Sequence, residues 1–318
     1  ILGSSGVFNV GTGSVSVSPL LQVGYANQPA SIIGTGTLTL TGGGDFRGGT
    51  IAAPLTNSGG TVKITTGDSG SVTFNGTVTN ATGSTISVEG AAGPGSSTAI
   101  IAGTLNNSGT VTLTNGNPSY SQYASLGSAT AVLNNLSGGV FNSSPGSYGG
   151  GARTVTGEFN NAGTVDLNTA TTFNIGAADS DNFSGAVFNV LSGASTISGS
   201  SGGKFWNAGV LNIASGATLA FSGPVILVQQ STGTYTGSGT LAIDVGATFS
   251  LGGNNVSLAP YLQFGTYNNS TGSAITGSGT LTLTAGGDFR GGTIAAPLTN
   301  SGGTVKITTG DSGSVTFN

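Results

Sequence analysis

Ten carboxylates are the residues of this chain best suited to acid–base chemistry, because it contains no histidine and no cysteine. Glycoside cleavage needs two carboxylates about 5–9.5 Å apart, and only Asp179 and Asp181 lie close together in sequence. On a strand, their i, i+2 spacing would place both side chains on one face. No basic residue lies near them in sequence to stabilise developing charge, so a solvated turn is the favoured interpretation. A polysaccharide-cleaving enzyme is therefore the weakest of three functional hypotheses.

The same segment could offer oxygen ligands to Ca²⁺, but it lacks the spaced acids of an EF-hand loop. The glycine- and aspartate-rich Ca²⁺-binding repeat is absent too, and Gly42–Phe46 resembles it only weakly. Without histidine, the commonest protein ligand for transition metals is missing. We therefore expect no catalytic residue, no metal site and no cofactor, and we do not expect an enzyme.

Composition excludes several further classes. Of the 318 residues, 60 are glycine, 5% are charged, and the net charge is −4, which disfavours nucleic acid as a partner. The absence of cysteine excludes a disulfide framework. No apolar run is long enough to span a bilayer, so we expect no membrane insertion within this segment. Gly, Ser, Thr and Asn mixed with Val, Leu and Ile are typical of short strands joined by tight turns.

The sequence contains a long internal repeat. Gly36–Asn75 recurs as Gly279–Asn318 at an offset of 243 residues, with one difference, Ala285 in place of Gly42. Self-similarity at a fixed period indicates a repeat architecture. The chain starts without Met and without a basic leader, and its first and last segments read as ordinary strands with no polar cap. We expect either that the polypeptide continues or that subunits stack end to end.

A shorter pattern recurs inside the long one: an apolar residue, one intervening residue, an asparagine, a glycine-containing corner and an alternating strand. The predicted corner residues are Asn57, Asn80, Asn107, Asn135, Asn161, Asn207 and Asn300. The predicted core column, two residues earlier, is Leu55, Val78, Leu105, Leu133, Phe159 and Phe205. A looser copy at Asn182 departs from the pattern, because Ser180 stands at its apolar position.

The spacing of this pattern predicts the fold. Dividing the 243-residue offset into ten units gives about 24 residues per unit, and units this short must stack to bury an apolar face. The alternating segments predict Val, Ile, Leu and Phe inward and Thr, Ser and Asn outward. We predict an all-β chain forming a parallel β-helix, or β-solenoid, as a single continuous domain over residues 1–318 with roughly 13 rungs. An antiparallel β-sandwich is the alternative.

Ten whole units between the two copies would let them stack in register. We therefore predict that Asn57 and Asn300 occupy the same corner, and that Phe46 and Phe289 lie on the same face. Asparagine tolerates left-handed turn geometry, and stacked amides can hydrogen-bond to one another. The sequence accordingly predicts a ladder of side-chain hydrogen bonds through Asn107, Asn135 and Asn161.

Three segments, Phe159–Leu167, Phe205–Gly223 and Gly237–Gly253, resemble secreted bacterial β-solenoid proteins, namely autotransporter passengers and filamentous-haemagglutinin-like adhesins. Gly36–Ile51 is similar to the autotransporter-associated β-strand repeat. The resemblance implies a right-handed parallel β-helix that is exported from a bacterium and located outside the cell or at its surface. The near-identical long copy departs from these families, whose rungs drift in sequence, and it favours a long modular fibre.

Two groups of residues are candidates for contacts with partners. Tyr120, Tyr123 and Tyr148 lie in stretches rich in Gly, Ser and Pro that we predict to be loops. Such tyrosines could contact sugars or proteins, or could fold back and bury their own rings. The second group is Asp45 and Arg47 with their copies Asp288 and Arg290. Each pair would share an outer strand face, either as a surface ion pair or as a contact between filaments.

These observations leave three functional hypotheses. The first is a structural protein, a segment of an extracellular filament or surface stalk whose partner is itself, end to end and possibly side by side. The second is an adhesin that binds glycans or host and cell surfaces through the tyrosine loops. The third is the polysaccharide-degrading enzyme considered above.

Overall fold

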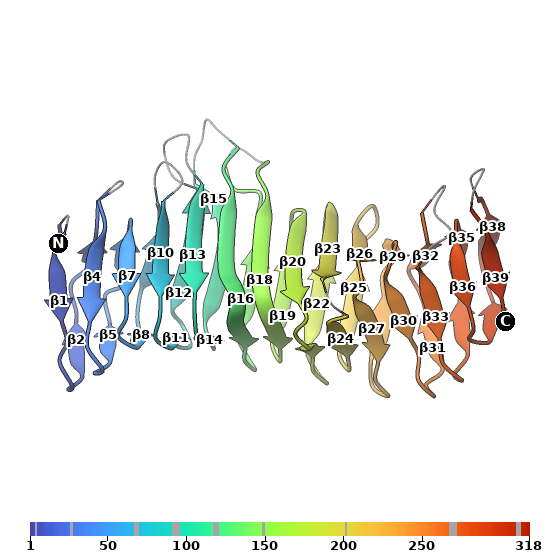
Figure 1. Ribbon diagram of the computed structural model, residues 1–318, viewed down its shortest axis with the longest axis horizontal. Coiled ribbons are helices and arrows are strands. Elements are labelled where there is room, and N and C mark those ends of the chain that lie inside the picture. The colour runs from blue at the N-terminus through green and yellow to red at the C-terminus, as the bar shows by residue number, and fades with distance from the viewer. Residues whose placement is uncertain are drawn as a thin grey trace. The chain divides into compact units, whose positions relative to one another are not determined.

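The computed structural model describes residues 1–3, 5–25, 28–66, 70–90, 96–116, 121–147, 150–200, 202–266, 272–309 and 313–318. These residues form short strands joined by turns, with no helix among them (Figure 1). The chain divides into two compact units, residues 1–164 and 165–318. Whether both form one continuous domain over residues 1–318 stays a prediction.

The first unit passes repeatedly through three columns of parallel strands. The first column contains β1 (Val7–Asn9), β4 (Ala30–Ile33), β7 (Gly49–Ile51), β10 (Ser71–Phe74), β13 (Ser97–Ile101) and the first halves of β16 (Ala124–Asn135) and β18 (Arg153–Asn161). The second contains β2 (Val15–Val17), β5 (Leu38–Leu40), β8 (Leu55–Asn57), β11 (Val78–Asn80), β14 (Thr104–Asn107) and the second halves of β16 and β18. The third contains β3 (Leu21–Val23), β6 (Gly44–Phe46), β9 (Thr61–Ile64), β12 (Thr85–Gly90), β15 (Thr110–Asn115) and β17 (Val140–Ser143).

The second unit repeats this plan, and β19 (Thr164–Leu167) leads into it. Its first column contains β20 (Thr171–Gly176), β23 (Ala194–Gly199), β26 (Thr218–Ser222), β29 (Thr240–Ile243), β32 (Tyr261–Phe264), β35 (Gly286–Phe289) and β38 (Thr304–Ile307). The second contains β21 (Ser180–Asn182), β24 (Lys204–Asn207), β27 (Ile226–Gln229), β30 (Thr248–Ser250), β33 (Ala274–Thr276), β36 (Gly292–Ile294) and β39 (Val315–Phe317). The third contains β22 (Val187–Val190), β25 (Val210–Ile213), β28 (Thr234–Thr236), β31 (Val256–Leu258), β34 (Leu281–Leu283) and β37 (Leu298–Asn300).

The prediction of a parallel β-solenoid is confirmed, with about 12–13 turns spaced about 24 residues apart. Because paired strands run parallel in these columns, the antiparallel sandwich is excluded. Alternating side chains fill the interior of each turn, and Phe173, Phe188, Phe205 and Phe221 stack with ring centroids 5.5–6.0 Å apart. Such contacts add about 0.5–1.5 kcal/mol per pair to the free energy gained by burying the rings.

The prediction that the two long copies occupy equivalent positions is wrong. Asn57 lies in the second column of its unit, beside Asn80, whereas Asn300 lies in the third column of its unit, beside Leu283. Phe46 and Phe289 likewise belong to a third and a first column. The physical reason is that this segment forms solenoid turns with fewer residues than the others. Leu38 already pairs with Leu55, so the turn between them is shorter than the average, and the offset between the copies is not a whole number of turns.

Candidate functional site

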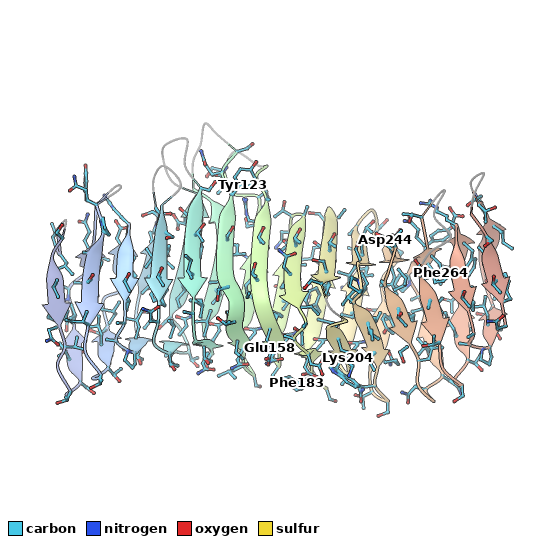
Figure 2. All side chains as sticks on the ribbon, in the orientation of Figure 1. Tyr123, Glu158, Phe183, Lys204, Asp244 and Phe264 are labelled. Atoms are coloured by element: carbon cyan, nitrogen blue, oxygen red, sulfur yellow. The ribbon has the colours of Figure 1, made fainter. Side chains whose placement is uncertain are left out.

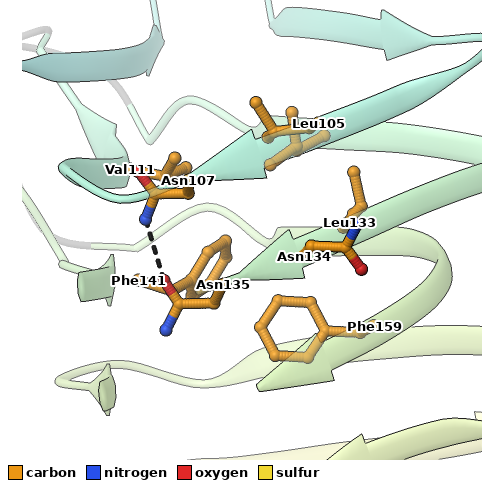
Figure 3. Close-up of a pocket in the computed structure, with 9 residues that line it drawn as sticks. Leu105, Asn107, Val111, Leu133, Asn134, Asn135, Phe141 and Phe159 are labelled. Atoms are coloured by element: carbon orange, nitrogen blue, oxygen red, sulfur yellow. Dashed lines mark hydrogen bonds between the residues drawn. The ribbon is translucent and has the colours of Figure 1, made fainter. Parts of the chain in front are cut away.

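A ladder of buried asparagine side chains is the most extended polar feature in the interior of the first unit. Each Nδ2 donates to Oδ1 of the asparagine one turn later, from Asn57 through Asn80, Asn107 and Asn135 to Asn161, at 2.8–3.0 Å. Figure 3 shows the bond from Asn107 to Asn135. These five residues are at most 3% exposed. The hydrogen bonds expected along Asn107, Asn135 and Asn161 are therefore present.

Each amide also closes the corner of the following turn. The Nδ2 atoms of Asn57, Asn80, Asn107 and Asn135 donate to the carbonyls of Thr85, Thr110, Val140 and Thr164, respectively, at 2.9–3.0 Å. Asn135 makes a further bond to Gly139 O at 3.3 Å. A buried primary amide supplies the two donors and the acceptor that this geometry needs. The ladder holds successive turns together and offers neither a nucleophile nor a proton donor with a pKa near neutrality.

At several corners the glycine after the asparagine is required by close approach, whereas Gly83, after Asn80, has a φ of +78° and open space around a Cβ. A Cβ on Gly139 would lie 2.7 Å from Oδ1 of Asn135, 2.9 Å from the carbonyl of Leu136 and closer still to the carbonyl of Asn107. Gly109 and Gly209 would each place a Cβ 2.8 Å from a ladder Nδ2 atom. This crowding explains the recurring Asn–small–Gly pattern.

Replacing Gly139 by alanine is therefore expected to destabilise the first unit by about 1–3 kcal/mol, the usual cost of overpacking. Chemical denaturation monitored by circular dichroism measures the change. Gly13→Ala is the control, since a Cβ at Gly13 meets no atom within 4 Å and is expected to change the stability little. Equal stability of the two variants would contradict the steric explanation.

The second unit has a shorter ladder. Asn182 Nδ2 donates to Asn207 Oδ1 at 2.9 Å, and Ser180 lies fully buried beside Phe205 in the core column. Asn182 was not among the predicted corner residues, because serine at position 180 breaks the apolar pattern. Its glycine-containing corner and the following alternating strand were the signals that could have identified it.

The ladder of the second unit ends where glutamine replaces asparagine. Gln229 pairs with Asn207, but its longer side chain turns away and donates to the carbonyls of Gln230 and Gly233 at 2.6 and 2.7 Å. Asn207 Nδ2 and Gln229 Oε1 are consequently buried without hydrogen-bond partners, as is the hydroxyl of Tyr235. Burial raises the pKa of Tyr235 well above its ordinary value, and the neighbouring Asn207 side chain opposes that shift.

We expect Gln229→Asn to extend this ladder and to stabilise the second unit by about 1 kcal/mol, the typical net value of one recovered hydrogen bond. The shorter amide places its Oδ1 where the ladder geometry puts an acceptor for Asn207. Thermal unfolding measures the gain, and Gln230→Asn, one residue further along, serves as the control. A lower melting temperature for Gln229→Asn would contradict this account.

The predicted core column is buried throughout. Leu55, Val78, Leu105, Leu133 and Phe159 form one stack in the first unit and are 1–3% exposed. Phe205 is 2% exposed in the second unit. A cavity of about 10 Å³ beside Leu105 and Phe159 is at the lower limit of the volume that one water molecule needs (Figure 3). The interior at this point has no room for a substrate.

Outer strand faces carry further amide ladders that the sequence pattern did not reveal. In the first unit Asn134 donates to Asn106 at 2.9 Å, and Asn160 donates to Asn134 at 3.1 Å. In the second unit Asn189 donates to Asp166 at 2.8 Å, and Asn212 donates to Asn189 at 3.0 Å. Equivalent polar side chains on successive turns thus satisfy one another outside the core as well as inside it.

Of the two acids that opened the search for chemistry, only Asp181 lies within a strand. Asp181 lies on β21 beside Trp206, whereas Asp179 is exposed in the preceding turn. Lys204 Nζ lies 5.2 Å from the Trp206 ring centroid (Figure 2 labels Lys204).

Across the described ranges, no three Asp, Glu, His or Cys side chains gather as a metal site. The same residues include no helix long and apolar enough to cross a membrane.

The two Asp–Arg pairs have matching local geometry. Arg47 Nε donates to Asp45 at 2.8 Å, and Arg290 Nε donates to Asp288 at the same distance. Thr65 and Thr308 donate to the other carboxylate oxygen of each pair. The hydrogen bond to Asp45 raises the pKa of Arg47. Because Arg47 remains 38% exposed, its ion pair with Asp45 lies at the surface and is worth about 0–1 kcal/mol. Asp288, in contrast, is buried, and Arg290 is 23% exposed.

Of the three candidate tyrosines, the structure places one. Tyr123 is 52% exposed just before β16 (Figure 2), whereas Tyr120 and Tyr148 lie outside the described residues. The backbone around Tyr123 is anchored by Arg153, which is fully buried at the start of β18. Its guanidinium donates to six carbonyls at 3.0–3.4 Å, those of Gln122, Ser144, Pro145, Gly150, Gly151 and Ala152.

Arg153 is a structural residue that the sequence pattern missed. Burial lowers the pKa of Arg153 below the ordinary range of an arginine, and the carbonyl oxygens solvate the charge in place of water. Nothing in the sequence distinguishes it from the other scattered basic residues, except that it opens a strand after a glycine-rich stretch. These hydrogen bonds hold the backbone of Gln122, Ser144 and Pro145 against the start of β18.

Comparison of the chain with protein families, with curated proteins and with solved structures found no match. The class of protein is therefore defined by the fold alone, as a parallel β-solenoid with stacked repeats.

Proposed function

We propose that this chain is a structural segment of an extracellular filament or cell-surface stalk. In this proposal, stacked solenoid turns carry load along the axis, and neighbouring segments contact one another end to end. The resemblance of its segments to autotransporter passengers and filamentous-haemagglutinin-like adhesins supports a secreted, bacterial origin. In this proposal, parallel backbone pairing and buried amide ladders supply the stiffness of the segment.

One observation carries the proposal: the near-identical 40-residue segment forms the same two-turn module in both units. Leu38 pairs with Leu55 and Phe46 with Ile64 in the first copy. The second copy repeats these pairings at Leu281 with Leu298 and at Phe289 with Ile307, although it occupies different columns. Because the segment forms the same pairings between its own strands in different columns, it suits a protein that is built by repeating this segment.

Immunogold electron microscopy of the producing cells tests the proposal. Antibodies raised against this chain are expected to label filaments or stalks at regular positions along their length. Labelling confined to the cell interior, or to surface material without elongated structures, would defeat it.

A second candidate function, adhesion, rests on Tyr123. Its exposed ring projects from a backbone that the Arg153 hydrogen bonds hold in place, and such rings can stack on sugars. Glycan-array binding that Tyr123→Ala abolishes would favour this function. Binding that is absent, or unchanged in the variant, would exclude this site.

A further inference from the structure

We propose that a polar hollow beside Arg47 in the first unit binds one neutral sugar residue of a glycan. This inference goes beyond the structural function proposed above, and it concerns a site other than Tyr123. The hollow has a volume of about 210 Å³ and lies where strands of the third column lead into strands of the first. Three successive turns contribute to it: Gln28 from one, Arg47 and Gly48 from the next, and Ser71 from the one after.

The fold fixes the wall of the hollow and leaves the space beside it unfilled. Arg47 donates its backbone N–H to the carbonyl of Val23 at 2.9 Å. Gly48 accepts the backbone N–H of Ala30 at 3.5 Å, so this segment is tied to the preceding turn. Gly48 itself is buried, yet a Cβ placed on it would meet no atom within 4 Å. Open space beside a fixed backbone is what a small bound molecule would occupy.

Unpaired hydrogen-bonding groups line this space. In Arg47, Nε lies 2.8 Å and Nη2 lies 2.6 Å from one carboxylate oxygen of Asp45, which uses two of the five guanidinium N–H groups. Within the described ranges, no partner takes the other three. The amide of Gln28 and the hydroxyl of Ser71 likewise have no hydrogen-bond partner among the described residues. The hollow therefore offers donors and acceptors together.

The charge of the hollow favours a neutral ligand over an ion. Asp45 balances the charge of Arg47, and the Thr65 hydroxyl donates to the second carboxylate oxygen at 2.8 Å. Arg47 is the one charged residue among the described residues that line the hollow, so no net charge is left to hold an ion. Sugar hydroxyls both donate and accept, and they match the guanidinium, the amide and the serine hydroxyl at once.

The size of the hollow and the position of Tyr25 fit a single sugar ring. Pockets that hold drug-sized ligands start at about 300 Å³, so this smaller hollow suits one ring rather than a buried oligosaccharide. Tyr25 and Gln28 exchange two backbone hydrogen bonds, at 3.1 and 2.7 Å, which place Tyr25 at the rim. Its phenol also helps to raise the pKa of Arg47, so the two side chains are near each other. The tyrosine ring supplies an apolar surface on which a sugar can stack.

The long repeat supplies a matched control for this site. Arg47 recurs as Arg290, whereas Tyr25 and Gln28 precede the repeated segment, which starts at Gly36. The repeat therefore copies the arginine without the two residues that complete the hollow. A substitution of Arg290 is expected to leave sugar binding unchanged.

Saturation-transfer NMR of chain 1–318 with glucose, galactose, mannose and N-acetylglucosamine tests the proposal. At least one of these sugars is expected to bind, and glucuronate, which carries a carboxylate, is expected to bind no more tightly than glucose. Arg47→Met is expected to weaken binding by about tenfold or more, the effect of losing one hydrogen bond to a charged group. Arg290→Met is expected to bind as the unchanged chain does.

Gly48→Leu provides a second, independent variant. Because a side chain at this position enters open space, leucine is expected to fill the hollow and to abolish binding while the chain stays folded. Circular dichroism checks folding, and failure of one variant to fold leaves the other as the test. Absence of binding by every neutral sugar, a preference for glucuronate, or binding that persists in the folded Arg47→Met and Gly48→Leu variants overturns the proposal. The filament function does not depend on this outcome, because the immunogold experiment tests it separately.

Discussion

Replacing Asn135 by leucine is expected to destabilise the first unit by about 2–4 kcal/mol. Asn135 takes part in four hydrogen bonds: it accepts from Asn107 and donates to Asn161, Gly139 and Thr164. Each is worth about 0.5–1.5 kcal/mol net, and leucine satisfies none of them. Because leucine has a similar volume, the loss reports the amide rather than a cavity. Urea denaturation measures the change.

The control is the neighbouring residue of the same type. Asn134 lies on the outer face of the same strand and exchanges hydrogen bonds only with Asn106 and Asn160. Since water can replace partners on that face, Asn134→Leu is expected to cost less than about 1 kcal/mol. Similar losses for the two variants would show that the interior ladder has no special role in stability.

Replacing Arg153 by methionine is expected to cost about 3–5 kcal/mol and to loosen the backbone at residues 121–123. The long apolar side chain fills the space, but six carbonyls lose their shared donor inside the wall. Hydrogen bonds to a charged group are worth about 1.5–3 kcal/mol each, and acceptors left without a donor add to the loss. Hydrogen exchange is expected to accelerate at residues 121–124 and 150–153, while protection at residues 55–64 stays unchanged.

Arg153→Lys separates charge from geometry. Lysine keeps the charge, but its donors all lie on one nitrogen atom. It therefore cannot reach the separate carbonyls that the three nitrogens of the planar guanidinium contact. We expect most of the destabilisation to remain. Arg47→Met, at a 38% exposed ion pair, is the control and is expected to cost at most about 1 kcal/mol. Full stability of Arg153→Lys would contradict a geometric role for the guanidinium.

The sequence predicted the fold and the interior ladder because both follow from local periodicity. An apolar residue two positions before asparagine, followed by a glycine corner, repeats at nearly constant spacing from Asn57 to Asn161. Stacking then follows from the inability of one turn to bury its own apolar face. The same pattern pointed correctly to the buried column from Leu55 to Phe159.

The position of Asn300 could not be predicted in the same way. The pattern repeats around Asn300 just as around Asn57, but the length of each turn decides which column a residue joins. Turn length depends on how compactly the corners fold, and the pairing of Leu38 with Leu55 shows that a turn can close in well under the average length. Arg153 was missed for a different reason: its acceptors come from residues 122–152, and no local sequence pattern records a convergence of backbone carbonyls.

The identical sequences at residues 55–74 and 298–317 offer the folding chain two alternative partners for the same strand. Strand Val78–Asn80 could nucleate on either copy, and the contacts made would be nearly the same. Residue 78 is 21 positions from Asn57 but 222 positions from Asn300. Closing the longer loop costs roughly 2 kcal/mol more in chain entropy, which favours the nearby copy by roughly 30-fold. Correct turn order therefore depends on proximity along the chain, and emergence of the nearer copy first during synthesis would reinforce it.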